Sequence, residues 1–95
     1  MKAILYKTDG TETEVFPVDG KEFQLEEMYR LIDCEIVELV QLGNGVDLWC
    51  DEEGLMKSNW MMNVKATELY REAHPDIPPQ ELGIVGNALF VDNTK

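Results

Sequence analysis

The residues best suited to bind a ligand lie in the stretch NVKATELY, where Asn63 opens an amphipathic run and Lys65 and Thr67 follow at alternate positions. Asn is a favoured N-cap residue, and the first turn of a helix presents unpaired amides with a partial positive charge. Lys65 adds a full positive charge, so this helix start is predicted to attract an anion. Trp60 precedes it and can stack on a ring. The alternative is structural, with Asn63 only capping, Trp60 packing and Lys65 solvated.

A second polar position is the pair Gly86-Asn87, which interrupts the apolar segment IVGNALFV at residues 84–91. Gly and Asn both tolerate left-handed backbone, so the pair predicts a bulge or a tight turn. An exposed bulge would aim the Asn87 amide at a ligand, whereas a purely structural turn would not. The glycine spacing does not fit a dinucleotide-binding fingerprint. The predicted ligand site comprises Trp60, Asn63, Lys65, Thr67, Gly86 and Asn87.

Negative charge is concentrated between residues 31 and 56, a region without Lys or Arg. Such a field can attract a basic protein or imitate a row of phosphates, although a solvated surface is the simpler interpretation. The candidate partner surface comprises Glu35, Glu38, Asp47, Asp51, Glu52 and Glu53. A calcium loop opened at Asp51 would need Gly sixth and Glu twelfth, where the chain has Met56 and Met62. No metal site is therefore predicted.

The nucleophiles of the chain do not form a recognisable catalytic pattern. There is one histidine, His74 beside a proline, one serine, Ser58, and no glycine-flanked nucleophile turn. Cys50 with His74 is a conceivable dyad, but buried cysteines are mostly inert packing residues. We therefore expect a protein that is not an enzyme and uses no cofactor.

Length and charge narrow the class of protein further. Ninety-five residues suit a single domain, 1–95, and the net charge of −11 disfavours direct binding to nucleic acid or to anionic lipid. No apolar run approaches the roughly 20 residues of a membrane helix. Cys34 and Cys50 lack the spacing of a redox or zinc pair, and the start of the chain looks like a strand rather than a signal peptide. A cytoplasmic protein with reduced thiols is the expectation.

The elements that must position these residues follow the order β-β-α-β-β-α-β. Period-two runs and turn residues predict strands over residues 2–7, 13–18, 34–40, 46–50 and 84–91. Apolar residues at helical spacing predict helices over about 23–32 and 64–73. The order indicates a compact α+β domain with a mainly antiparallel sheet of about five strands and two helices. An exposed edge at 34–40 would allow two copies to pair as a homo-oligomer.

Four segments also carry a resemblance: MKAILYKTDGTETEVFPVDGKEF, EIVELV, NVKATELY and IVGNALFV. In this order they resemble a family of small proteins from phages and mobile elements of Gram-positive bacteria, catalogued as domain of unknown function 3846. The likeness spans nearly the whole chain, and its most specific part is Asn-x-x-Ala-Thr together with Gly-Asn-x-Leu. The chain departs from the family over 57–62 and 73–81. The resemblance implies an accessory gene that acts against or alongside host defences.

These observations lead to two hypotheses of different kinds. The first is a non-enzymatic binding protein that antagonises bacterial defence by sequestering a small nucleotide-derived signal, with polar contacts from the predicted ligand site and stacking on Trp60. The second is an acidic decoy that occupies a basic surface of a host protein. Added salt should abolish binding by a decoy and weaken a pocket binder only slightly. A small hydrolase acting on signalling nucleotides is a third possibility, which would reveal itself by forming product.

Overall fold

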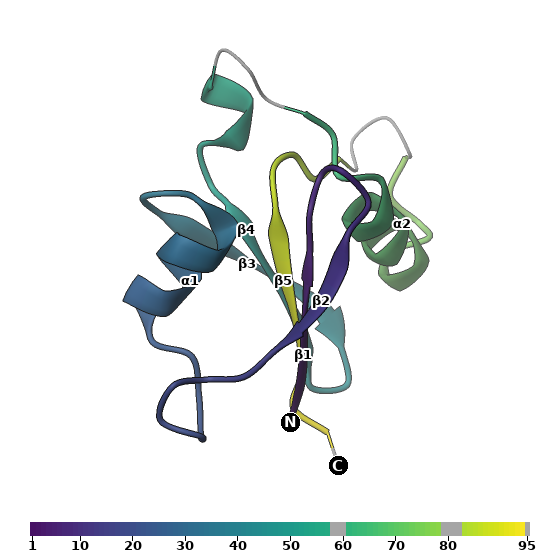
Figure 1. Cartoon of the computed structure of the whole chain (residues 1–95). Helices are drawn as coiled ribbons and strands as arrows, with labels where there is room; N and C mark the ends of the chain where they lie inside the picture. Colours follow the sequence, from purple (N-terminus) through teal and green to yellow (C-terminus); the bar gives the residue numbers. More distant parts are fainter. Residues whose placement is uncertain (58–60, 79–82, 95) are drawn as a thin grey trace.

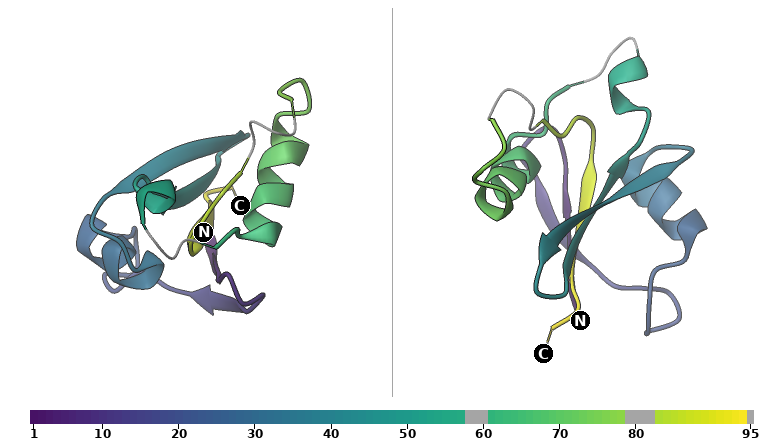
Figure 2. Two further views of the ribbon diagram at one scale, coloured as in Figure 1. Left: turned by 90° about the horizontal axis from the view of Figure 1, so that it is seen from above. Right: turned by 180° about the vertical axis from the view of Figure 1, so that it is seen from behind.

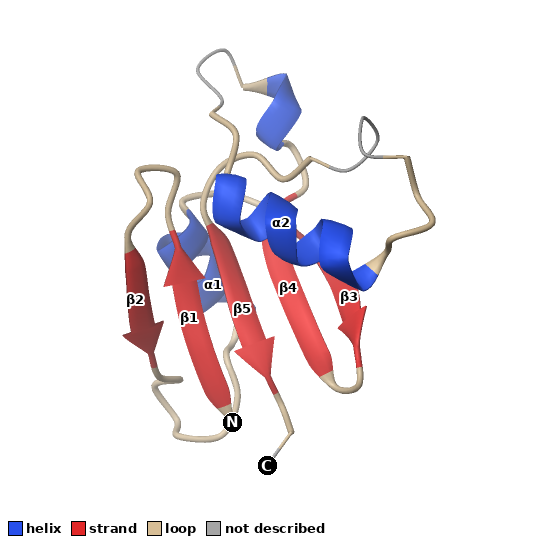
Figure 3. Cartoon of the chain, turned by 90° about the vertical axis from the view of Figure 1, so that its right-hand side faces the viewer, coloured by secondary structure: helices blue, strands red, loops and turns tan. Residues whose placement is uncertain are grey.

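The computed structural model describes residues 1–57, 61–78 and 83–94, and it arranges them in three layers (Figures 1 and 2). The middle layer is an antiparallel sheet of β1 (Lys2–Tyr6), β2 (Glu12–Val15), β3 (Val37–Gly43), β4 (Val46–Asp51) and β5 (Ala88–Asp92). Helix α1 (Leu25–Ile32) covers one face and helix α2 (Val64–Ala73) covers the other (Figure 3). A short 3-10 helix, η1 (Gly54–Met56), follows β4. The predicted α+β fold and its element order are confirmed.

The strands run in the order β2-β1-β5-β4-β3 across the sheet, with every neighbouring pair antiparallel. The β1–β2 and β3–β4 pairs are hairpins, and β5 joins them by pairing with β1 on one side and β4 on the other (Figure 3). The strand latest in the described sequence therefore holds the centre of the sheet, while β2 and β3 form its two edges.

Each face of the sheet has its own apolar core. On the α1 side the buried residues are Ala3, Met28, Ile32, Leu89 and Val91. On the α2 side they are Leu48, Cys50, Ala66, Ile84 and Ala88. Neighbouring residues of a strand point to opposite faces, so consecutive apolar residues in β5 supply both cores. This explains why its sequence, ALFV, is continuously apolar rather than alternating.

Several strand boundaries differ from the prediction by up to four residues. The strand predicted at 34–40 begins at Val37, because Asp33 adopts a left-handed conformation with φ of 65° and the Cys34 N–H bonds back to the Tyr29 carbonyl at 3.0 Å. The second strand ends at Val15, before Pro17, which cannot donate to a sheet. The last strand begins at Ala88 rather than at 84, after the glycine kink. Helix α2 has the predicted bounds. None of the helices in the described ranges has the length and apolarity needed to cross a bilayer.

Candidate functional site

Asn63 fixes the start of α2 against the sheet. Its Oδ1 accepts from the Ala66 N–H at 3.1 Å, which confirms the predicted N-cap. Its Nδ2 donates to the carbonyls of Tyr6 and Gly86, both at 2.9 Å, and its backbone N–H donates to the Ile84 carbonyl at 2.7 Å. The residue is only 1 % exposed. These bonds use the amide inside the fold, so the structure replaces the predicted ligand contact of Asn63 with a structural role.

Thr67 has a comparable role one turn further along α2. Its hydroxyl accepts from the Ile84 N–H at 3.0 Å and lies 3.4 Å from the Ile84 carbonyl, to which it donates. Thr67 is 2 % exposed, so its hydroxyl holds the segment before β5 against α2 and is not accessible from solvent. Like Asn63, Thr67 was predicted to contact a ligand and has a structural role instead. Together the two residues bring the start of α2 and the glycine kink side by side.

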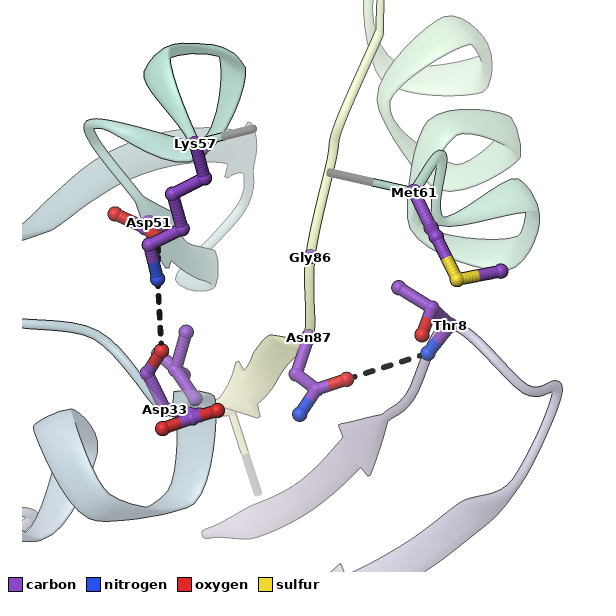
Figure 4. Close-up of a pocket in the computed structure, with 9 residues that line it drawn as sticks. Thr8, Asp33, Asp51, Lys57, Met61, Gly86 and Asn87 are labelled. Atoms are coloured by element: carbon purple, nitrogen blue, oxygen red, sulfur yellow. Dashed lines mark hydrogen bonds and ion pairs between the residues drawn. The ribbon is translucent and has the colours of Figure 1, made fainter. Parts of the chain in front are cut away.

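A cavity of about 250 Å³ lies on the other side of this kink, between it and η1 (Figure 4). We call it the polar notch. Its lining consists of Thr8, Ile32, Asp33, Asp51, Gly54, Lys57, Met61, Gly86 and Asn87. Five separate segments supply these residues, so the notch exists only when the end of α1, the end of β4 and the kink are assembled.

Gly86 and Asn87 are the two predicted ligand residues that line this notch. The side chain there belongs to Asn87. Its Oδ1 accepts from the Thr8 N–H at 3.2 Å, and Figure 4 shows the amide nitrogen turned away from Thr8, toward the Asp33 side of the cavity. Gly86, with φ of 77°, makes the kink that gives Asn87 this direction. Its N–H donates to the Met61 carbonyl at 2.9 Å. The amide nitrogen of Asn87 is thus directed toward the notch.

The far wall of the notch is an ion pair. Lys57 Nζ lies 2.7 Å from Asp51 Oδ2 and donates to the Asp33 carbonyl at 3.0 Å. The hydrogen bond to Asp51 is the main reason why the pKa of Lys57 is raised. Only 5 % of the Asp51 side chain is exposed, so this carboxylate belongs to the notch and is removed from the predicted acidic partner surface. The positive charge of this pair belongs to Lys57, which directly follows the segment 31–56 that lacks Lys and Arg.

The other acidic candidates do not gather on one surface. Glu38 lies opposite Cys50 on the α2 side of the sheet, whereas Asp47 lines a cavity with Met28 and Trp49 on the α1 side. The remaining three, Glu35, Glu52 and Glu53, are exposed where β3 begins and β4 ends. The acidic surface predicted as one patch is therefore divided between two faces and one end of the sheet.

A second cavity, of about 200 Å³, lies between the β1–β2 turn and the start of α2. We call it the basic hollow. Its lining consists of Tyr6, Lys7, Thr8, Asp9, Gly10, Thr11, Val64 and Lys65. Lys65 thus faces a cavity at the helix start, and Lys7 accompanies it. Sequence reasoning missed Lys7, because nothing local shows that the Asp9-Gly10 turn rests against α2.

The charge of the basic hollow is only partly neutralised by its one carboxylate. The side-chain hydroxyl and the backbone N–H of Thr11 both donate to Asp9, and these bonds lower the pKa of Asp9. Asp9 is therefore ionised at neutral pH and opposes two lysines. The first turn of α2 adds its own partial positive charge. Trp60, the remaining predicted ligand residue, lies outside the described residues.

The cysteines provide a test of the non-catalytic interpretation. Burial raises the pKa of the Cys50 thiol to about 12 and also raises that of Cys34. His74 Nε2 is 2.9 Å from the Gln41 carbonyl and its ring packs edge-on against Tyr70, so the imidazole is engaged by residues other than a cysteine.

At about pH 8 we expect iodoacetamide to label neither cysteine rapidly in the folded protein and both in guanidinium, because the thiolate is the reactive form. A Cys50→Ser variant assigns the label, and rapid native labelling of Cys50 would contradict this expectation.

Comparison with known proteins adds one match. The model of a family described as a domain of unknown function (DUF3846) matches residues 1–95. No curated protein and no solved structure matches the chain.

Proposed function

This chain belongs to the DUF3846 family, and we propose that it is a non-enzymatic protein that binds and sequesters a small nucleotide-derived ligand. The supporting observation is that Thr8 lines both the polar notch and the basic hollow. The two cavities are therefore neighbours, one rich in hydrogen-bonding groups and the other in positive charge. A nucleotide has the same division, with a polar base and sugar at one end and phosphate at the other.

The chemistry of each cavity suggests which end of the ligand it takes. In the notch, the Asn87 amide can bond the edge of a base, and the Asp33 carboxylate can accept from sugar hydroxyls. In the hollow, Lys7, Lys65 and the first amides of α2 suit a phosphate. The opposite orientation is disfavoured, because it would place phosphate beside the carboxylates of Asp33 and Asp51.

The biological setting of this proposal is a phage or mobile element that antagonises bacterial defence in the cytoplasm of its host. A protein that sequesters a signal needs tight binding and no turnover. The buried thiol of Cys50 and the engaged ring of His74 agree with such a role. An acidic decoy for a basic host protein has less support, since the six acidic candidates do not share a surface.

Replacing both Lys7 and Lys65 with Ala is expected to weaken binding of a phosphorylated ligand about 100-fold, since two charge-assisted contacts are lost. Binding of the corresponding nucleoside should be unchanged. Isothermal titration with a panel of cyclic and linear nucleotides, each beside its nucleoside, measures both. Lys2 and Lys21 are also exposed, so a Lys2→Ala and Lys21→Ala double variant is the matched control for charge.

Two results would contradict the proposal. One is equal affinity of the Lys7/Lys65 variant and the control for every nucleotide that binds. The other is the appearance of product when ligand is incubated with excess protein, which would identify an enzyme. A collapse of nucleotide affinity with added salt would point to surface attraction instead of a pocket.

A further inference from the structure

Strand β2 presents an open edge of the sheet, because β1 is its partner on one side and the order places no described strand on the other. The Lys7 N–H donates to the Thr11 carbonyl at 3.0 Å, and this bond shows which residues of β2 direct their backbone groups toward β1. Every second residue after Thr11 then bonds to β1. The intervening residues, Glu12 and Glu14, direct their backbone N–H and carbonyl groups toward the open side. This edge can therefore accept another strand.

The two faces of this edge differ in chemistry. Glu12 lies opposite Tyr6 and Glu14 opposite Ile4, so both carboxylates are on the α2 side, where Tyr6 packs against Phe90. Val15 lies opposite Ala3 and packs on the α1 core. Side chains of an added strand would alternate in the same way. One face of that strand would meet two carboxylates, and its other face would meet Thr13 and then the apolar side chain of Val15.

The apolar side continues into a groove of about 280 Å³ lined by Val15, Phe16, Val18, Glu27, Arg30 and Leu31. Phe16 is 72 % exposed and Val18 is 83 % exposed, which is unusual for large apolar side chains. Glu27 is buried, and both of its carboxylate oxygens lie 3.3 Å from the Val18 N–H. The exposed segment is thus tied to α1, and its apolar side chains are held at the groove.

We propose that β2 is a docking edge for an extended segment of a basic partner protein, in which basic and apolar residues alternate. The segment adds to the sheet as a further strand, as in other cases of β-augmentation. Its basic side chains face Glu12 and Glu14, and an apolar side chain enters the groove. Arg30 at the groove reinforces this register, since it repels a basic side chain there.

Charge complementarity selects this occupant over a second copy of the chain. Pairing of two β2 strands would bring the carboxylates of Glu12 and Glu14 close to those of the other copy, and like charges on facing strands are unfavourable. A chain with a net charge of −11 also repels itself at long range. A basic segment is instead attracted by Glu12 and Glu14 at short range and by the net negative charge at long range.

Two peptides of about six residues test this proposal. One alternates Lys and Val, and the other has the same composition with the lysines and valines in separate blocks. We expect the alternating peptide to bind at least about tenfold more tightly in fluorescence anisotropy, and to slow hydrogen exchange of the Glu12 and Glu14 amides. Equal binding of the two peptides, or exchange that does not change at these amides, would overturn the proposal.

Variants at Glu14 separate the backbone contribution from the charge. Glu14→Gln removes the charge only, whereas Glu14→Pro also removes the N–H on the open side, where an edge strand tolerates proline. We expect the proline variant to bind the alternating peptide about tenfold more weakly than the glutamine variant, with an unchanged circular dichroism spectrum. Glu35→Gln is the control for charge. If Glu14→Pro instead dissolves a dimer seen in sedimentation of the protein alone, the occupant is a second copy and the proposal fails.

Discussion

The Asn63→Ala variant is expected to lose about 3 kcal/mol of unfolding free energy, a large share of the stability of a small domain. The change removes the N-cap of α2, which contributes about 1 kcal/mol. It also removes the Nδ2 donor from the buried carbonyl of Tyr6 and the half-buried carbonyl of Gly86, next to a residue that is itself 1 % exposed. A buried acceptor without a partner costs about 1 to 3 kcal/mol. Urea denaturation followed by circular dichroism measures the loss.

Two further variants show which atoms of Asn63 matter. Asn63→Asp keeps an oxygen for the Ala66 N–H but cannot donate to the two carbonyls, so we expect it to be no more stable than Asn63→Ala. Asn87→Ala is the matched control, since that half-buried amide makes one hydrogen bond, to the Thr8 N–H, within the described part of the chain. We expect it to lose less than about 1 kcal/mol. Similar stabilities of the Asn63 and Asn87 variants would show that the hydrogen bonds of Asn63 contribute little to the unfolding free energy.

The Gly54→Ala variant is expected to lose about 2 kcal/mol and to distort the polar notch. A Cβ at Gly54 would collide with Cγ2 of Val85 and come within 3.3 Å of the Val85 carbonyl oxygen. Val85 cannot yield easily, because it is 8 % exposed and forms a bridge with Met62. The wall of the notch at Gly54 must therefore move. Thermal denaturation and nucleotide titration report the two effects separately.

The control for Gly54 is Gly83→Ala, because a Cβ at Gly83 meets no atom within 4 Å. We expect this variant to retain the stability of the natural chain. Adding Val85→Ala to Gly54→Ala removes the colliding methyl group, so the double variant should lose less stability than the sum of the two single variants. Strict additivity would mean that the two residues do not collide in solution.

The elements of this fold were predictable wherever local chemistry defines them. Asn63 marked the start of α2 because an N-cap depends on its own helix. The hairpin between β1 and β2 followed from Asp9-Gly10, since such turns require residues that tolerate positive φ. The start of β3 was misplaced by three residues, because the left-handed turn at Asp33 has no strong signal in a residue that is not glycine.

The site was predictable only in part, because the residues that line it come from segments far apart in the sequence. Sequence analysis predicted one ligand site for Asn87 and Lys65, whereas the two residues line different neighbouring cavities. It also could not know that the donors of Asn63 would be used by the carbonyls of Tyr6 and Gly86. Nor could it pair Lys57 with Asp51, which looked like part of an uncompensated acidic run. Helical spacing tells which residues share a helix face. It does not tell which loop packs against that face.

The central position of β5 has a consequence for how the molecule is made. During synthesis on the ribosome, the β1–β2 and β3–β4 hairpins leave the exit tunnel well before residues 88–92 do. Without β5 the hairpins have no strand to connect them, and both cores lack the side chains that β5 supplies. The nascent chain therefore completes its sheet only after this strand has emerged, and until then the edges of β1 and β4 that β5 will cover are exposed to chaperones or to other nascent chains.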